Sequence, residues 1–273
     1  MIPYDEFKLG IDQILKCDED FLCELLATVI KNPGRYTGRF RLSNARTKLI
    51  QNVTQSREIK FGDFMEDIVT EYIRRIGYEN LNKNIGRDES GDSLQADQVF
   101  KKDGVIYLIE QKIRDDHDST KKRGQYDNFS KKCRLLKRLY PDSTVDATMW
   151  FIDDSLQKNR HYYEGRANQE NAKMDGITRH ILYGKQLFND VLSCSEAWDE
   201  LCSHLDRNKQ ERSQEILNIP DFDTSPEMLN ALKALKNSEP ALYQKLLSND
   251  PKYVQLRREM FPTGHNLERV SAA

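Results

Sequence analysis

The sequence predicts a mixed α/β fold, in which a central mixed β-sheet is flanked by helices and followed by a helical C-terminal region. Three observations predict it. Apolar residues recur at helical spacing over 61–76, two apolar segments are joined by Asp103-Gly104, and a third apolar segment, 147–152, follows another helical pattern. This order of helix, hairpin, helix and strand is typical of a sheet covered by helices, and 273 residues suffice to bury a sizeable core.

Apolar spacing and stop signals place the expected helices. Two short amphipathic helices fill residues 1–30, and Pro33 stops the second. A basic connector with little periodicity follows them. The helix over 61–76 ends at Gly77, a typical C-terminal stop. A further pattern predicts a helix over 125–140.

Apolar alternation and turn residues place the remaining elements. Residues 94–101 and 105–112 are expected to be the strands of a hairpin, because Asp-Gly is a common two-residue turn. Three polar segments are expected to be turns or loops: 78–93, 113–123 and 153–177. A helix containing 184–191 follows, and helices continue to the end with breaks at Pro220, Pro226, Pro240 and Pro251.

These elements divide the chain into three expected segments. They are N-terminal helices with a basic connector over 1–60, a sheet-bearing core over 61–205, and a helical region over 206–273. No apolar run approaches the ~20 residues that a membrane-spanning helix needs. The N-terminus also lacks the basic and apolar pattern of a secretory signal. We therefore expect a cytoplasmic protein that does not contact membranes.

Cysteine and histidine spacing disfavours several kinds of chemistry. The five cysteines form no CxxC pair, which disfavours a disulfide framework and a zinc site. The five histidines show neither HxxxH nor HExxH spacing, so a zinc enzyme or a histidine nucleophile is disfavoured as well. The chemistry has to be sought among the carboxylates and the basic residues.

Opposite charges are segregated along a chain whose net charge is only −2. Between 31 and 60 a single acid, Glu58, accompanies eight basic residues: Lys31, Arg35, Arg39, Arg41, Arg46, Lys48, Arg57 and Lys60. Between 112 and 138 there are ten basic residues and four aspartates. Two such blocks in a mildly acidic protein are typical of a phosphate-binding surface. Solvated helix faces are the alternative for either block alone.

The hairpin register brings two acids together. If residues 103 and 104 form the turn, counting outward places Asp97 opposite Glu110 and Gln95 opposite Lys112. Side chains opposite one another in an antiparallel pair have Cβ atoms ~4.5–5.5 Å apart. Strand alternation places Lys112 on the same face as Glu110. Two carboxylates and an amine therefore converge at the end of an apolar strand.

Facing carboxylates repel one another, so the arrangement predicts a bound cation. Carboxylate oxygens suit Mg²⁺, which shares its coordination shell with water and substrate phosphates. Such an ion stabilises charge on a phosphoryl group, and Lys112 can orient an attacking water or neutralise the developing charge. The chemistry that fits these residues is phosphodiester hydrolysis.

The same residues resemble the active-site motif of the PD-(D/E)XK nucleases, with Asp97 as the first acid and Glu110-Gln111-Lys112 as the E-x-K. The resemblance implies a restriction-endonuclease-like core, with Asp97 and Glu110 as metal ligands and Lys112 as a catalytic lysine. The proline of the motif is missing before Asp97. Three other matches to the short motif, none of which ends an apolar strand paired with an acid-bearing one, are Glu6-Phe7-Lys8, Glu58-Ile59-Lys60 and Asp250-Pro251-Lys252.

A second feature of that family is a G-x-x-x-E pattern on the helix before the hairpin, which Gly62 and Glu66 match. The resemblance implies that Glu66 joins the metal shell. Because Glu66 lies beside the apolar stripe of its helix, an ordinary flanking glutamate is the alternative.

Residues 110–125, together with Tyr183-Gly184-Lys185, resemble type II restriction endonucleases of that superfamily, over roughly residues 60 to 190. The resemblance implies that the charged segment after Lys112 binds DNA phosphates and reaches base edges. The candidate DNA-binding residues are Arg87, Arg114, His117, Ser119, Lys121, Lys122 and Arg123. Further candidates for base contacts are Arg160, Arg166, Asn168 and Gln169.

The leading hypothesis is a Mg²⁺-dependent type II restriction endonuclease that cuts a short site in double-stranded DNA as a homodimer, since symmetric sites match two-fold symmetric proteins. The resemblance extends to enzymes that cut sites of the GANTC type. Two alternatives stay open. One is a repair or recombination nuclease of the same fold, and the other is a non-catalytic DNA-binding protein whose acids and lysine form a structural ion-pair cluster.

Overall fold

The computed structural model describes residues 1–38, 40–88, 90–215 and 217–272. The chain forms two compact units, each made from two separate stretches of sequence. Residues 1–9 and 62–211 form the sheet unit, and residues 10–61 and 212–273 form the helical unit. The chain passes from one unit to the other near residues 60 and 205, where boundaries were predicted. The division of the chain into three segments stays a prediction.

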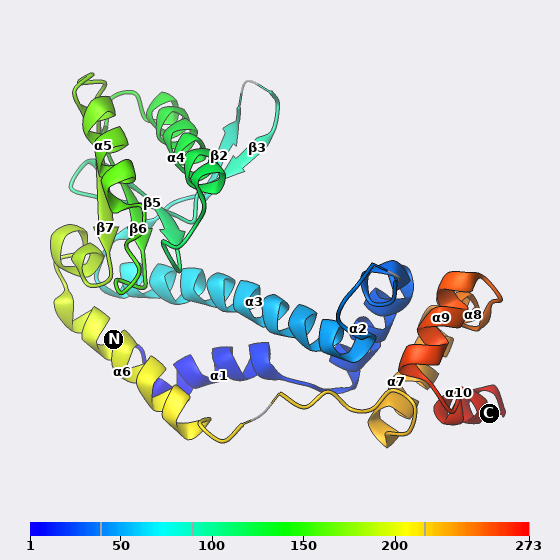
Figure 1. Ribbon diagram of the computed structural model, residues 1–273. Coiled ribbons are helices and arrows are strands. Elements are labelled where there is room, and N and C mark those ends of the chain that lie inside the picture. The colour runs from blue at the N-terminus through cyan, green and yellow to red at the C-terminus, as the bar shows by residue number, and fades with distance from the viewer. Residues whose placement is uncertain (39, 89, 216, 273) are drawn as a thin grey trace. The chain divides into compact units, whose positions relative to one another are not determined.

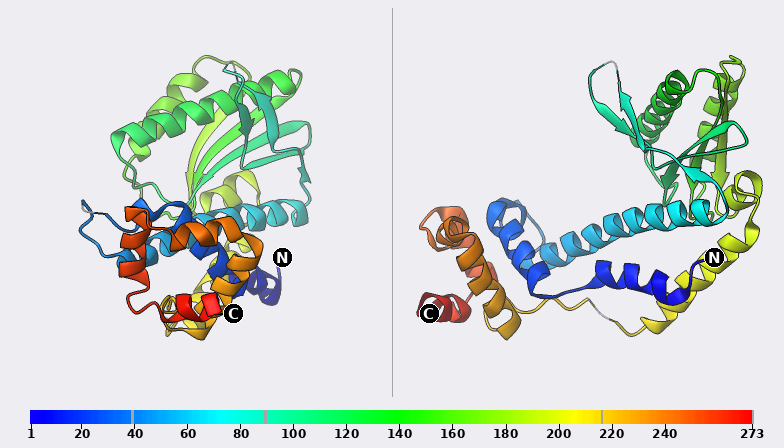
Figure 2. Two further views of the ribbon diagram at one scale, coloured as in Figure 1. Left: turned by 90° about the vertical axis from the view of Figure 1, so that its right-hand side faces the viewer. Right: turned by 180° about the vertical axis from the view of Figure 1, so that it is seen from behind.

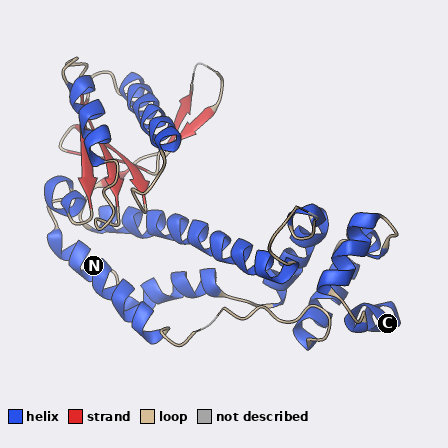
Figure 3. Ribbon diagram, viewed as in Figure 1, coloured by secondary structure: helices blue, strands red, loops and turns tan. Residues whose placement is uncertain are grey.

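A five-stranded mixed sheet lies at the centre of the sheet unit (Figure 3). Its strands, in spatial order, are β1 (Glu79–Asn80), β4 (Gln98–Lys102), β5 (Val105–Lys112), β6 (Thr144–Phe151) and β7 (Ile177–Tyr183). The pairs β1–β4 and β4–β5 are antiparallel, whereas β5–β6 and β6–β7 are parallel. The predicted mixed sheet with flanking helices is confirmed.

The predicted hairpin is confirmed, with a change at one end. Asp103 and Gly104 both have positive φ, 50° and 79°, and Lys102 pairs with Val105. The first strand, predicted over 94–101, is wrong in extent, because β4 begins only at Gln98. Residues before it form β3 (Ser93–Gln95), which pairs with β2 (Asn84–Arg87) in a separate two-stranded sheet. The chain changes partner immediately before Asp97, where the Ala96 N–H donates to the Lys83 carbonyl.

Helices cover both faces of the five-stranded sheet. α4 (Ser119–Leu139) and α5 (Arg160–Asn171) lie on one face (Figures 1 and 2). Their buried aromatic residues join a core with side chains of β5, β6 and β7. On the other face Trp150 packs edge-to-face against Phe188 and Trp198, from the π-helical turn η2 (Leu187–Val191) and α6 (Ser195–Glu211). Apolar burial on both faces explains why β5 and β6 are continuous apolar runs.

Four helical predictions need correction. α3 (Ala45–Arg75) begins well before residue 61, because Ala45, Leu49 and Val53 form a narrow buried stripe that the surrounding basic residues hide. α4 begins at Ser119 rather than near 125, because the Asp118 side chain caps it by accepting from the Thr120 and Lys121 N–H groups. The expected helix over 184–191 is only the turn η2, and α5 occupies a stretch predicted as irregular.

The strands missed by sequence analysis have weak apolar signals. β1 and β2 fall within the polar segment 78–93. β7 begins at the end of the segment expected to be irregular. Every second residue of β7 is buried, and one of these buried residues is Arg179. This buried guanidinium pairs with Glu170 at 2.9 Å and Asp175 at 2.7 Å, so a charged residue stands where an apolar one was expected.

The helical unit has its own apolar core. Its complete helices are α2 (Glu19–Lys31), the 3₁₀ turn η1 (Pro33–Arg35), α7 (Pro226–Ser238), α8 (Pro240–Leu247), α9 (Pro251–Met260) and α10 (His265–Ala272). α1 (Tyr4–Leu15) and α3 contribute residues to both units. The predicted C-terminal breaks are confirmed, and three of the prolines begin a helix, where the missing N–H costs no hydrogen bond. Among the described residues, no helix is both long and apolar enough to span a membrane.

Candidate active site

The end of β5 brings Asp97, Glu110 and Lys112 together. The β4–β5 ladder runs from Lys102↔Val105 to Gln98↔Ile109, so one further step places Asp97 opposite Glu110. Asp97 Oδ2 accepts a hydrogen bond from the Gln111 N–H at 2.6 Å. The predicted register is confirmed as far as Asp97, which is held against β5 just outside the ladder. The prediction that Gln95 lies opposite Lys112 is wrong, because the chain changes partner before Asp97 and Gln95 pairs with Asn84 of β2.

The Lys112 ammonium is surrounded by oxygens. Its Nζ lies 2.8 Å from Glu110 Oε1, 2.8 Å from the Gln111 carbonyl oxygen and 3.5 Å from Asp97 Oδ2. The predicted grouping of two acids and an amine is therefore present in the fold. The three oxygens converge on a single cationic position.

A second ammonium, which sequence analysis missed, lies on the other side of Glu110. Lys132 Nζ of α4 donates to Glu110 Oε2 at 2.5 Å and lies 4.0 Å from Asp97 Oδ1. Lys132 is only 5% exposed. Its position beside Cys133 and three residues after Phe129, both buried, was the available signal. The lysine was instead counted with the basic block at 112–138, which was interpreted as a phosphate-binding surface.

Burial and mutual repulsion raise the pKa of Asp97, with Glu110 as the repelling partner. Burial by itself would lower the pKa of the Lys112 ammonium, but Glu110 and Asp97 outweigh it and raise that pKa. Both pKa values are raised for the same reason: the site is poorly hydrated, so neighbouring charges act strongly on one another. The cation that facing carboxylates demand is provided in this structure by the two lysines.

Glu66 is positioned by α3 and by β4. Gln98 Nε2 donates to the Glu66 carbonyl at 2.7 Å, and the Thr70 hydroxyl donates to Gln98 Oε1 at 2.7 Å, which ties the helix to the strand. Burial, and then the charge of Asp97, raise the pKa of the Glu66 carboxyl from 4.5 to about 7. This carboxyl lies within electrostatic reach of the facing acids, and its role as a metal ligand stays a prediction.

The segment after Lys112 is anchored by the buried carboxylate of Asp115. Asp115 Oδ2 accepts from the Asn159 N–H at 2.8 Å and from the Tyr183 hydroxyl at 3.0 Å, while Oδ1 accepts from Asn159 Nδ2 at 2.8 Å. Asn159 Nδ2 also donates to the His117 carbonyl. Tyr183, the first residue of the Tyr183-Gly184-Lys185 segment, therefore helps to hold the loop that follows β5.

The predicted DNA-binding residues lie on three elements. Arg114 and His117 are in the loop between β5 and α4, and Arg87 ends β2, where its guanidinium donates to the Gly91 carbonyl at 2.7 Å. The other four, expected in a loop, occupy the first turns of α4: Ser119, Lys121, Lys122 and Arg123. Cations near a helix N-terminus oppose the helix dipole, a cost that a bound phosphate relieves. The remaining candidates, Arg160, Arg166, Asn168 and Gln169, lie on α5.

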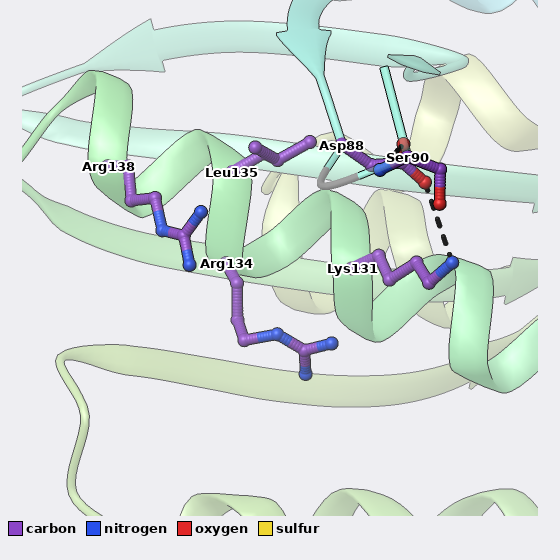
Figure 4. Close-up of a pocket in the computed structure, with 6 residues that line it drawn as sticks. All are labelled: Asp88, Ser90, Lys131, Arg134, Leu135 and Arg138. Carbon is purple, nitrogen blue, oxygen red and sulfur yellow. Dashed lines mark hydrogen bonds and ion pairs between the residues drawn. The ribbon is translucent and has the colours of Figure 1, made fainter. Parts of the chain in front are cut away.

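A further basic hollow lies between the β2–β3 hairpin and α4 (Figure 4). Its lining residues are Asp88, Ser90, Lys131, Arg134, Leu135 and Arg138. Lys131 Nζ is 3.6 Å from Asp88 Oδ2, so one of the three cations is partly neutralised. Within the basic block at 112–138, Lys112 and Lys132 thus contact Glu110 at the end of β5, whereas other members line this hollow: Lys131, Arg134 and Arg138.

Comparison with known proteins indicates a nuclease, as does the grouping of acids and lysines at the end of β5. A family model described as "Type II restriction endonuclease, HinfI" matches residues 10–88 and 78–209. The chain belongs to this family. It is also 26% identical over 227 residues to the type II restriction enzyme HinfI of Haemophilus influenzae, a match that covers 78% of each protein. The predicted resemblance to type II restriction endonucleases is confirmed, and HinfI-family membership favours this hypothesis over a repair nuclease or a non-catalytic binder.

The oxygens at the end of β5 suit a divalent ion of the kind that restriction enzymes use. Two carboxylates, from Asp97 and Glu110, and the Gln111 carbonyl already contact the Lys112 ammonium, which stands where a cation is favoured. Mg²⁺ takes few protein ligands and keeps several waters. Within the described ranges, no group of three or more His, Cys, Asp or Glu side chains is arranged around a metal position. The donor set fits an ion bound by two carboxylates and a carbonyl.

Proposed function

We propose that this HinfI-family enzyme hydrolyses phosphodiester bonds in double-stranded DNA at a short specific sequence, with Mg²⁺ as its cofactor. The observation that supports the proposal is the convergence of two facing carboxylates and two ammonium groups at the end of β5. A cluster of this charge, in which the Lys112 side chain is 25% exposed, can hold a divalent ion and a phosphoryl group together.

Each residue of the cluster has a proposed role. Asp97 and Glu110 hold the ion through their carboxylate oxygens, with Glu66 as a further ligand. Bound Mg²⁺ supplies Lewis-acid stabilisation of the charge on the phosphoryl oxygens. Lys112 orients the attacking water and neutralises developing charge. Lys132 is a positioning residue, because its hydrogen bond to Glu110 Oε2 leaves Oε1 facing the site.

The proposed DNA contacts lie around this cluster. Basic side chains of the loop and of the first turns of α4 are proposed to contact backbone phosphates: Arg114, Lys121, Lys122 and Arg123. Phosphate contacts set the position of the duplex but do not read sequence. Arg87, His117 and Ser119 are therefore proposed to contribute contacts to base edges as well.

We further propose that the active form is a homodimer. Each copy has one such cluster, whereas a double-strand break needs both strands to be cut. A two-fold symmetric pair of copies presents two equivalent clusters to the two strands of a symmetric site.

A cleavage assay on sequenced plasmid DNA tests the proposed function. The purified full chain is incubated with plasmid and Mg²⁺, and the ends are mapped; duplexes containing GANTC are the first candidates. Discrete fragments with one common end sequence are expected. A smear, cleavage that depends on branched DNA, or no cleavage with any divalent ion would contradict the proposal.

A further inference from the structure

The helical unit carries a basic segment, residues 31–57, that the proposed active site does not use. No Asp or Glu occurs between Glu24 and Glu58, a stretch that contains Lys31 and six further basic residues. The structure places this segment at the end of α2, in η1, in the chain leading to α3, and in the first half of α3. Arg39 of this segment lies outside the described residues. The segment is therefore a continuous source of positive charge within the helical unit.

Two large apolar side chains stand out from this basic segment into solvent. Phe40 is 98% exposed and Leu42 is 105% exposed, although the same segment buries Tyr36 and Ala45. Scattered apolar residues on a surface need no explanation. Here, however, Phe40 and Leu42 flank Arg41, so apolar and cationic groups alternate on one exposed stretch.

The cations beside these side chains are only partly neutralised. Arg41 Nε donates to the Gly34 carbonyl, which shapes the loop without cancelling the charge. Arg46 pairs with Asp221 at 3.4 Å. Among the described residues, no carboxylate forms an ion pair with Arg35. Next to it, a hollow is lined by Lys31, Arg35 and Lys252. Lys31 pairs with Glu239 and Lys252 with Asp250, each at 3.1 Å, so Arg35 contributes most of the positive charge there.

A nucleic-acid duplex matches this combination better than a second copy of the chain does. A two-fold symmetric contact centred on this segment would set one basic segment against another, without acids of the segment to compensate the charge. A duplex offers phosphates to the guanidinium groups and the apolar faces of sugars and bases to the side chains between them. Exposed apolar residues flanked by arginines are a recurring means of binding a DNA groove.

We infer that the basic segment 31–57 is a second binding surface for duplex DNA, on which Arg35 and Arg41 contact phosphates and Phe40 and Leu42 pack against sugars and bases of one groove. The inference rests on the proposed function in that it takes DNA as the substrate. It adds a contact outside the sheet unit, and it assigns the helical unit a role in substrate binding.

Two double variants separate the electrostatic contribution from the apolar one. Arg35→Gln with Arg41→Gln should weaken binding of a short duplex about tenfold, and should lower the slope of log affinity against log salt by about 2, at ~0.9 per phosphate contact. Phe40→Ala with Leu42→Ala should weaken binding by a similar factor, on the order of tenfold, without changing that slope. Affinity is measured with Ca²⁺ replacing Mg²⁺, so that binding is observed without cleavage.

The matched control is Lys233→Gln with Arg258→Gln. These two residues are exposed, lie in the same unit outside the basic segment, and change the net charge by the same amount. Unchanged melting temperatures verify that all variants fold. The control should bind DNA within about twofold of the wild type, because non-contacting surface charges act only through a screened field.

The possible outcomes distinguish the inference from the proposed function. If wild type cuts DNA and both double variants bind it as tightly as wild type, the inference fails and the proposed function stands. Equal weakening by the control also overturns it, since general charge would then explain the effect. So does a loss of self-association without a change in DNA affinity, which would identify a contact between copies. If wild type neither binds nor cuts DNA, both fail.

Discussion

The ammonium of Lys132 lies among buried groups that carry opposite charge, and its removal would leave Glu110 and Asp97 facing each other with one cation instead of two. Removing one partner from a buried ion pair costs about 3–5 kcal/mol. Lys132→Met should therefore lower the free energy of unfolding by about that amount at neutral pH in the presence of EDTA.

The neighbouring Lys131→Met is the matched control, because Lys131 is on the exposed face of α4. Its effect should stay within about 0.5 kcal/mol. Chemical denaturation with and without Mg²⁺ measures both variants. Added Mg²⁺ should recover part of the loss in the Lys132 variant only, since it restores a cation to the carboxylates. Equal small losses in both variants would contradict the positioning role.

The raised pKa of Glu66 predicts a pH dependence of stability. A carboxyl whose pKa is about 7 in the folded chain keeps its proton while the unfolded chain, near 4.5, has lost it. The folded state then binds more protons between these values, so its stability falls as pH rises through this window. In Glu66→Gln the free energy of unfolding should fall less over this pH range, by on the order of 1 kcal/mol, because the carboxyl is partly exposed.

Free energies of unfolding at about pH 5 and about pH 8, measured in EDTA for wild type and Glu66→Gln, check this expectation. The free energy of unfolding of the variant should still fall somewhat with rising pH, because the pKa of Asp97 is also raised. Identical declines in the two proteins would show that Glu66 does not keep its proton in the fold.

At the scale of elements, the loop after β5 depends on Asp115. All three groups that contact its carboxylate are donors, from Asn159 and Tyr183. Asp115→Asn would place an amide NH₂ against one of these donors. Because hydrogen bonds to charged groups contribute about 1.5–3 kcal/mol each, we expect a loss of about 2–3 kcal/mol.

Asp116→Asn provides the comparison, since Asp116 is exposed and adjacent in sequence. Thermal denaturation of the two variants should show a large shift for Asp115 and almost none for Asp116. The Asp115 variant should also cut DNA more slowly than the Asp116 variant at equal protein concentration. Similar melting temperatures for the two would mean that the loop is held by other contacts.

Elements whose signals are local could be predicted from the sequence. The Asp103-Gly104 turn fixes the register of β5, and that register places Asp97 opposite Glu110 without any long-range information. Elements that are stabilised by contacts distant in sequence could not be predicted. β7 carries a buried Arg179 that only Glu170 and Asp175 make acceptable. Lys132 was missed for the same reason, because a helix pattern does not show which carboxylate its ammonium meets.

At the scale of the whole molecule, the homodimer is a prediction that concentration tests directly. Sedimentation of the full chain with a duplex that carries the mapped site should show two copies of the 273-residue chain on the DNA. A monomer that becomes a dimer on adding a duplex with the mapped site would agree with dimerisation on DNA. A monomer in both conditions would contradict the proposed two-fold arrangement.

We propose that Asp97, Glu110 and Lys112 form a metal-dependent site that cuts DNA. The most direct test compares cleavage and DNA binding for wild type, Asp97→Ala, Lys112→Ala and Lys8→Ala, whose lysine belongs to a similar E-x-K triplet away from the sheet. The two site variants should cut on the order of a thousandfold more slowly while binding DNA nearly as well, and Lys8→Ala should behave as wild type. Cleavage by Lys112→Ala or Asp97→Ala at the wild-type rate would show that these residues do not form the active site.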